Sequence, residues 1–139
     1  MIPEFRGLYK SDGFWVYGSY IHCEVYGDII KPFDSLIEYD VIPETVGQYI
    51  GLTDKKGKKI YQGDICKHVI LRREATVNPL VTLTVIVQQR YGCWGYLPTH
   101  PTLVHPDDRE WKPFYQDEEL DLDYFEVIGN IHEHPELIK

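Results

Sequence analysis

The sequence predicts an all-β protein. Aromatic residues make up 14% of the chain, with eleven tyrosines, and such side chains favour the pleated surface of strands. Residues 81–88 alternate between two sets of side chains with the two-residue period of a half-buried strand. No stretch of ten or more residues carries an apolar stripe at helical spacing. Short strands joined by turn residues are therefore expected along the whole chain.

The N-terminal part is expected to form a β-hairpin or meander. Its predicted strands are residues 14–20, 21–26, 29–30 and 35–41. Gly27 and Asp28 supply a turn. The last of these strands ends before Pro43, because the residue before a proline is pushed to extended conformations. One short helical turn is expected over residues 43–46, and residues 1–45 are assigned to an N-terminal β subdomain.

The rest of the chain, residues 46–139, is expected to form a second subdomain. Its predicted strands are residues 49–53, 65–71, 81–88, 93–97 and 125–131. Short strands separated by turn residues suit a small barrel or a sandwich. Gly57 and Gly63 are expected to adopt positive φ in turns. Residues 72–79 are predicted to be a loop, and residues 98–113, with four prolines, an irregular excursion.

The predicted core combines two tryptophans with apolar residues of the later strands. Its members are Trp15, Trp94, Leu83, Val85, Val87, Phe125, Val127 and Ile131. An exposed Trp94 beside Tyr91 and Tyr96 would instead indicate a ligand or partner patch.

Three segments carry a family resemblance. The central one is PETVGQYIGLTDKKGKKIYQGDI at residues 43–65, the first is FRG followed by GFWVYGSY within residues 5–20, and the last is FEVIGNIHEHPEL at residues 125–137. Together they resemble the YopX family, small proteins of phages and prophages. The resemblance implies an SH3-like small barrel in the C-terminal part. The N-terminal subdomain is expected to pack on it, so that both form one compact unit. The resemblance also implies a prophage origin and supplies no catalytic residues.

Charge is unevenly distributed along a chain whose net charge is −8. Residues 107–126 carry nine acidic and two basic side chains, a net −7, whereas residues 52–74 carry seven basic and three acidic side chains, a net +4. An acidic total disfavours non-specific binding to a polyanion, although a local basic lobe can still contact one.

The cysteines and the hydropathy favour a cytoplasmic protein of the bacterial host cell. Three widely spaced cysteines, Cys23, Cys66 and Cys93, do not resemble a disulfide framework. No apolar run approaches the ~18 residues that span a bilayer, and the first residues lack the pattern of a secretory signal. No membrane association is expected.

The candidate binding residues lie on the lysine-rich turn. They are Lys55, Lys56, Lys58, Lys59 and Tyr61. Lysines contact phosphates, and nearby aromatic rings stack on bases. The alternative is a hairpin tip whose lysines are simply solvated.

No catalytic residue, cofactor or metal site is predicted. His132 and His134 would share a face of a continuing strand, but an isolated H-x-H pattern is weaker than the established zinc spacings. His100 and His105, near Asp107 and Asp108, lack an identifiable nucleophile. The acidic run at residues 117–123 is interpreted as a charged edge strand. Cys66 and Cys93 are interpreted as small buried apolar residues.

The sequence therefore favours a non-enzymatic prophage protein that acts by binding as a homo-oligomer. In this hypothesis the basic turn of one copy meets the acidic stretch of another, and a phage or host protein is a further partner. The alternative is a nucleic-acid-binding accessory protein that uses the lysine-rich hairpin. A third hypothesis is an enzyme that uses the histidines or a bound metal.

Overall fold

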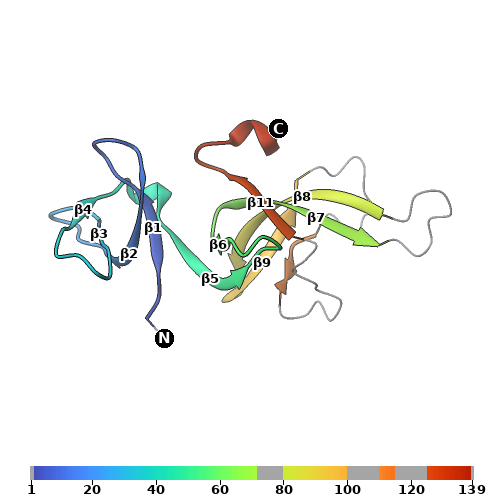
Figure 1. Cartoon of the computed structure of the whole chain (residues 1–139), viewed down its shortest axis with the longest axis horizontal. Helices are drawn as coiled ribbons and strands as arrows, with labels where there is room; N and C mark the ends of the chain where they lie inside the picture. Colours follow the sequence, from blue (N-terminus) through green and yellow to red (C-terminus); the bar gives the residue numbers. More distant parts are fainter. Residues whose placement is uncertain (1, 72–79, 100–109, 115–124, 139) are drawn as a thin grey trace. The chain divides into compact units, whose positions relative to one another are not determined.

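The computed structural model describes residues 2–71, 80–99, 110–114 and 125–138 (Figure 1). The described residues form strands and short 3-10 turns, so the predicted all-β class is confirmed. The chain divides into two compact units, unit 1 (Met1–Ile50) and unit 2 (Gly51–Lys139), which are considered separately. The boundary after residue 45 and the packing of both parts into one unit stay predictions.

Unit 1 is built from a meander of short antiparallel strands. They are β1 (Phe5–Leu8), β2 (Trp15–Ile21), β3 (Ile29–Lys31) and β4 (Tyr39–Asp40), followed by the 3-10 turn η1 (Pro43–Thr45) and β5 (Gly47–Thr53). The strand order is β4-β3-β2-β1-β5. β5 begins in unit 1 and passes into unit 2, where β6 (Lys59–Tyr61) follows it in the sheet.

The core of unit 1 is small and is centred on three residues, each from a different segment. Val16, Ile30 and Val41 are buried, and aromatic side chains such as Phe5 and Tyr9 pack against them. Trp15 was expected in this core but is only half-buried. Its ring instead lies 4.5 Å from the guanidinium carbon of the buried Arg6, a cation–π arrangement that covers the charge.

Two predicted strands of unit 1 are wrong in extent. β2 ends at Ile21, and residues 22–28 turn back toward β3 rather than continuing as a strand. The Gly27 N–H donates to the Cys23 carbonyl over 2.8 Å and Gly27 adopts φ 86°, which closes this turn. The predicted strand over residues 35–41 reduces to the two residues of β4.

Unit 2 contains a second antiparallel sheet. After β6 come β7 (Asp64–Leu71), β8 (Leu80–Arg90), β9 (Cys93–Pro98), β10 (Lys112–Pro113), β11 (Phe125–Asn130) and the 3-10 turn η6 (Pro135–Ile138) (Figure 1). The strand order is β10-β9-β8-β7-β11. Among the described residues, β10 and β11 are the two edges and do not pair with each other. A closed SH3-like barrel is therefore not confirmed.

The core of unit 2 follows the predicted alternation of β8. Leu83, Val85 and Val87 are buried. On the same sheet the ring of Phe125 stacks on His68, with centroids 4.0 Å apart, and contacts the rings of Tyr96 and Phe114. All four rings are buried, so this ring cluster belongs to the core of the unit.

Three predicted core residues of unit 2 are only half-buried: Trp94, Val127 and Ile131. A register shift between Val127 and Gly129 breaks the alternation of β11, because a bulge lets two residues of one strand face one residue of its neighbour. β11 then ends at Asn130, so Ile131 lies beyond the strand.

Candidate binding surfaces

Asp54 organises the lysine-rich turn between β5 and β6. Its buried carboxylate accepts hydrogen bonds from the backbone N–H groups of Lys56 and Lys58 through Oδ1, both at 2.9 Å. Oδ2 accepts a third bond, also of 2.9 Å, from the N–H of Val127 in β11. Gly57 adopts φ 79° in this turn, as predicted. One side chain therefore shapes the turn and attaches it to β11.

The first two lysines of the turn are paired within the chain. Lys56 Nζ lies 2.7 Å from Glu126 Oε1, and Lys55 Nζ lies 3.4 Å from Oε2 of the same carboxylate. The hydrogen bond that Lys56 donates to Glu126 raises the pKa of Lys56, and the bonds donated by Lys56 and then Lys55 lower the pKa of Glu126. A phosphate would have to compete with Glu126 for both ammonium groups.

The remaining predicted binding residues differ in exposure. Lys58 and Lys59 are exposed. Tyr61 is only 4% exposed, and its N–H donates to Asp64 Oδ2 over 2.8 Å. Its ring is therefore not available for stacking on a base in this conformation. The binding role of Lys55, Lys56, Lys58, Lys59 and Tyr61 stays a prediction.

The histidines near the C-terminus lie in a turn rather than on a strand. Asn130 Oδ1 accepts hydrogen bonds from the N–H groups of His132 and Glu133, and the Asn130 N–H donates to His134 Nδ1. The strand geometry that would have placed both imidazoles on one face is therefore absent. Within the described residues, no three His, Cys, Asp or Glu side chains group as a metal site.

Other sequence candidates have mixed positions. Cys66 is buried as predicted, whereas Cys93 is half-buried. His100, His105, Asp107, Asp108 and the acidic run at residues 117–123 lie outside the described residues. No helix in the described part of the chain is long and apolar enough to cross a membrane.

A polar cluster in unit 1 was not anticipated from the sequence. The buried Asp28 accepts a 2.5 Å bond from the Tyr20 hydroxyl through Oδ2, and its Oδ1 lies 2.6 Å from His22 Nδ1. The bond from Tyr20, followed by that from His22, lowers the pKa of Asp28. Tyr20 and His22 precede the turn and Asp28 follows it. The cluster is therefore visible only once the turn brings these side chains together. The cluster fixes the base of the loop at residues 22–28.

We expect Tyr20 to ionise later than an ordinary tyrosine. Burial, followed by the bond to Asp28, raises the pKa of Tyr20 from 10.0 to about 12. Because the pKa is raised on folding, the stabilisation is complete below pH 10 and is lost as the pH rises through about 12. Tyrosinate absorbance of the parent minus that of Tyr20→Phe should show this late step. In Asp28→Asn the step should move back toward pH 10; a step that stays late would contradict the role of Asp28.

The loops that flank β3 expose apolar side chains. Val25 is 81% exposed, Tyr26 86% and Leu36 95%, and Ile21, Phe33 and Ile37 are also exposed. The sequence interpretation placed most of these residues in strands, where alternate side chains would be buried. Apart from Ile21, which is the last residue of β2, these side chains lie in the loops on either side of β3.

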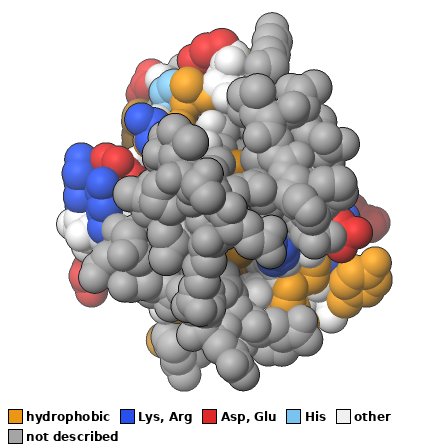
Figure 2. Space-filling view, turned by 90° about the vertical axis from the view of Figure 1, so that its right-hand side faces the viewer, with side chains coloured by type: hydrophobic (Ala, Val, Ile, Leu, Met, Phe, Trp, Pro, Cys, Tyr) orange, Lys and Arg blue, Asp and Glu red, His pale blue; other side chains and the backbone are white. Residues whose placement is uncertain are grey.

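In Figure 2, Lys and Arg side chains gather at the left margin of the face with an acidic side chain beside them, and hydrophobic side chains gather at the lower right with charged side chains next to them. Hydrophobic and charged side chains also lie together near the top of this face.

Comparisons with known proteins agree with the observed fold. The profile of a family described as YopX protein matches residues 4–139. The crystal structure of protein EF1440 from Enterococcus faecalis is similar over 100% of this chain and 99% of that chain, with a TM-score of 0.53 and 20% sequence identity. At that identity the likeness concerns the fold alone. No curated protein matches the chain significantly.

Proposed function

The chain belongs to the YopX family, and we propose that it is a non-enzymatic binding module that assembles with further copies of itself. The proposal is supported by the exposed apolar loops of unit 1, residues 21–27 and 32–38. Monomeric soluble proteins rarely leave large contiguous apolar patches exposed, and such patches mark interaction sites. A second copy that covered these loops would remove their apolar area from water.

Charge favours a protein partner over a nucleic acid at these loops. Residues 1–50 contain three basic and eight acidic side chains, a net −5, so unit 1 repels a polyanion. In unit 2, Lys55 and Lys56 are paired with Glu126 and the Tyr61 ring is buried. The nucleic-acid alternative therefore has less support than self-assembly. A cytoplasmic location and a phage or host protein as a further partner stay predictions.

We expect the purified protein to be oligomeric at micromolar concentration in sedimentation velocity. Replacing Tyr26 and Leu36 together with aspartate should shift it to monomer, because each substitution places a charge in the covered apolar area. The matched control is Ile2→Asp, which changes another exposed apolar side chain outside both loops and should leave the mass unchanged. A parent protein that sediments as a monomer would overturn the proposal.

A further inference from the structure

The tip of the β8–β9 hairpin presents an aromatic ring at a conformational cost. Arg90 pairs with Cys93, so Tyr91 and Gly92 form a two-residue turn with φ 53° and φ 76°. Positive φ at both positions is the primed geometry that usually takes asparagine or glycine. A tyrosine with positive φ is uncommon and strained. Its ring is 93% exposed, so no burial within the described residues compensates for this strain.

A second aromatic ring lies beside the tip. The Trp111 indole N–H donates to the Gln88 carbonyl over 3.4 Å, and the ring lies 6.0 Å from that of Tyr91 at an angle of 67°. A Cβ atom at Gly95 would lie 2.5 Å from the Trp111 ring. Because Gly95 has no side chain, the indole can lie against β9, and there it contacts the Tyr91 ring.

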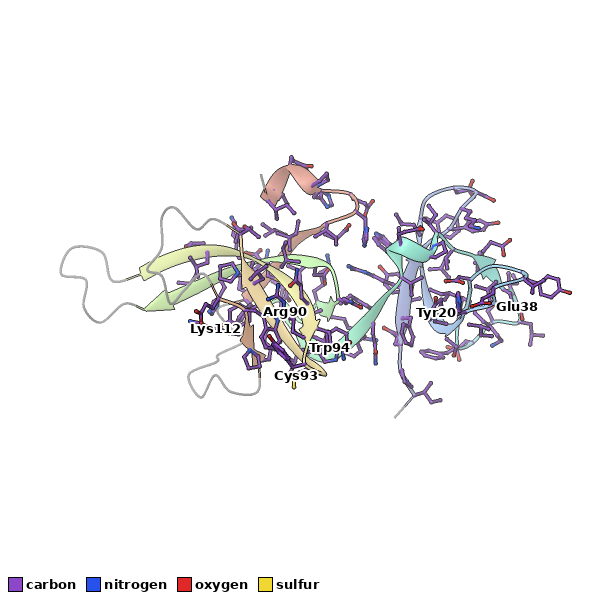
Figure 3. The ribbon with its side chains drawn as sticks, turned by 180° about the vertical axis from the view of Figure 1, so that it is seen from behind. Tyr20, Glu38, Arg90, Cys93, Trp94 and Lys112 are labelled. Carbon is purple, nitrogen blue, oxygen red and sulfur yellow. The ribbon has the colours of Figure 1, made fainter. Side chains whose placement is uncertain are left out.

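A basic residue adjoins the tip in the sequence. Arg90 precedes Tyr91 and is exposed, and Figure 3 labels it in unit 2. Lys112, which follows Trp111, is half-buried. We define the tip surface as Arg90, Tyr91 and Trp111. It combines aromatic area with an exposed positive charge, which suits an apolar surface edged by carboxylates.

The loop between β3 and β4 in unit 1 has the complementary composition. Phe33, Leu36 and Ile37 are exposed apolar residues, and the exposed Asp34 and Glu38 accompany them. Figure 3 labels Glu38. Among the unit 1 loops that expose apolar residues, this loop has two carboxylates, whereas the loop at residues 21–27 has only Glu24. We define this acidic apolar loop as residues 32–38.

We propose that the tip surface of one copy docks on the acidic apolar loop of a second copy. This inference rests on the proposed self-assembly and names its contact surfaces. The two surfaces differ, so the contact is heterologous: each copy has one of each, and assembly continues from copy to copy into a ring or a filament. The Tyr91 ring covers Leu36 and Ile37, while Arg90 faces Glu38.

Charge reversal separates this contact from other modes of assembly. In sedimentation equilibrium, Arg90→Glu alone and Glu38→Arg alone should each weaken self-association by about tenfold or more, because each places like charges opposite one another. A 1:1 mixture of the two variants should assemble as the parent does, since each tip then meets a loop of opposite charge. Asp12→Arg is the control, because it reverses an exposed charge outside both surfaces and outside the lysine-rich turn.

Substitution of Tyr91 separates binding from folding. Asparagine tolerates positive φ better than tyrosine, so Tyr91→Asn should leave the thermal midpoint unchanged or raise it while weakening self-association. Tyr91→Phe keeps the ring and should associate as the parent does. Tyr91→Asn is thus expected to weaken association without lowering the thermal midpoint. A variant with a damaged fold would lower both.

The outcomes distinguish this inference from the proposed function. A monomeric parent overturns both. An oligomeric parent whose association is unchanged by Arg90→Glu, Glu38→Arg and Tyr91→Asn overturns this inference and leaves self-assembly standing. Failure of the charge-reversed mixture to assemble, with both variants folded, also overturns it. Stronger binding of the parent than of Tyr91→Asn to a fluorescent oligothymidylate, with unchanged self-association, would assign the tip to single-stranded nucleic acid instead.

Discussion

Phe125→Ala is expected to lower the free energy of unfolding of unit 2 by about 3–5 kcal/mol. Phe125 is fully buried, and its ring contacts those of His68, Tyr96 and Phe114. Removing the ring leaves a cavity between these three side chains. His68 lies on β7, Tyr96 lies on β9, and Phe114 directly follows β10. Such a loss is a large part of the ~5–15 kcal/mol that stabilises a typical domain.

Urea denaturation monitored by tryptophan fluorescence measures this effect. Trp94→Ala, monitored by circular dichroism, is the comparison, because Trp94 is half-buried on β9 of the same sheet. Its loss is expected to be smaller, about 1–2 kcal/mol. Equal losses for the two variants would contradict the placement of Phe125 at the centre of the core and of Trp94 at its margin.

The elements that could be predicted from the sequence are those whose signal is local. The alternation of β8 is visible in residues 81–88, and Gly57 and Gly63 do adopt positive φ. The strand predicted at residues 21–26 failed because the buried Asp28 binds Tyr20 and His22 and draws the chain into a loop. An aspartate's tertiary partners do not appear in local periodicity.

The candidate binding residues show the same limit. The lysine-rich turn was expected between strands at residues 49–53 and 65–71, but β6 (Lys59–Tyr61), which was not predicted, follows it directly. The ion-pair partner of the turn, Glu126, lies in β11, far along the sequence. Tyr61 was interpreted as an exposed ring because it neighbours the lysines, whereas the turn formed with Asp64 carries it into the interior. Composition alone identified the positive charge of the turn. The position of β11 beside the turn determines how many of its lysines are paired with Glu126 and how many could bind a ligand.

Asp54→Ala is expected to lower the free energy of unfolding of unit 2 by about 2–4 kcal/mol. The substitution removes the acceptor of three backbone bonds, from Lys56, Lys58 and Val127. Two of these bonds hold the turn in shape and the third attaches it to β11. Bonds to a charged acceptor contribute more than neutral ones, and a buried donor without a partner adds a penalty.

Hydrogen exchange of Asp54→Ala locates the loss. The amides of Lys56, Lys58 and Val127 should exchange faster than in the parent, while those of β8 should change only through the lower global stability. Asp54→Asn keeps Oδ1 as an acceptor for the turn but presents an NH₂ group to Val127, so it should speed exchange mainly at Val127. Lys58→Ala, at an exposed side chain, should change stability by no more than about 0.5 kcal/mol. Unchanged exchange at Val127 in both Asp54 variants would show that the turn is attached to β11 by other contacts, such as the Lys55 N–H bond to the Phe125 carbonyl.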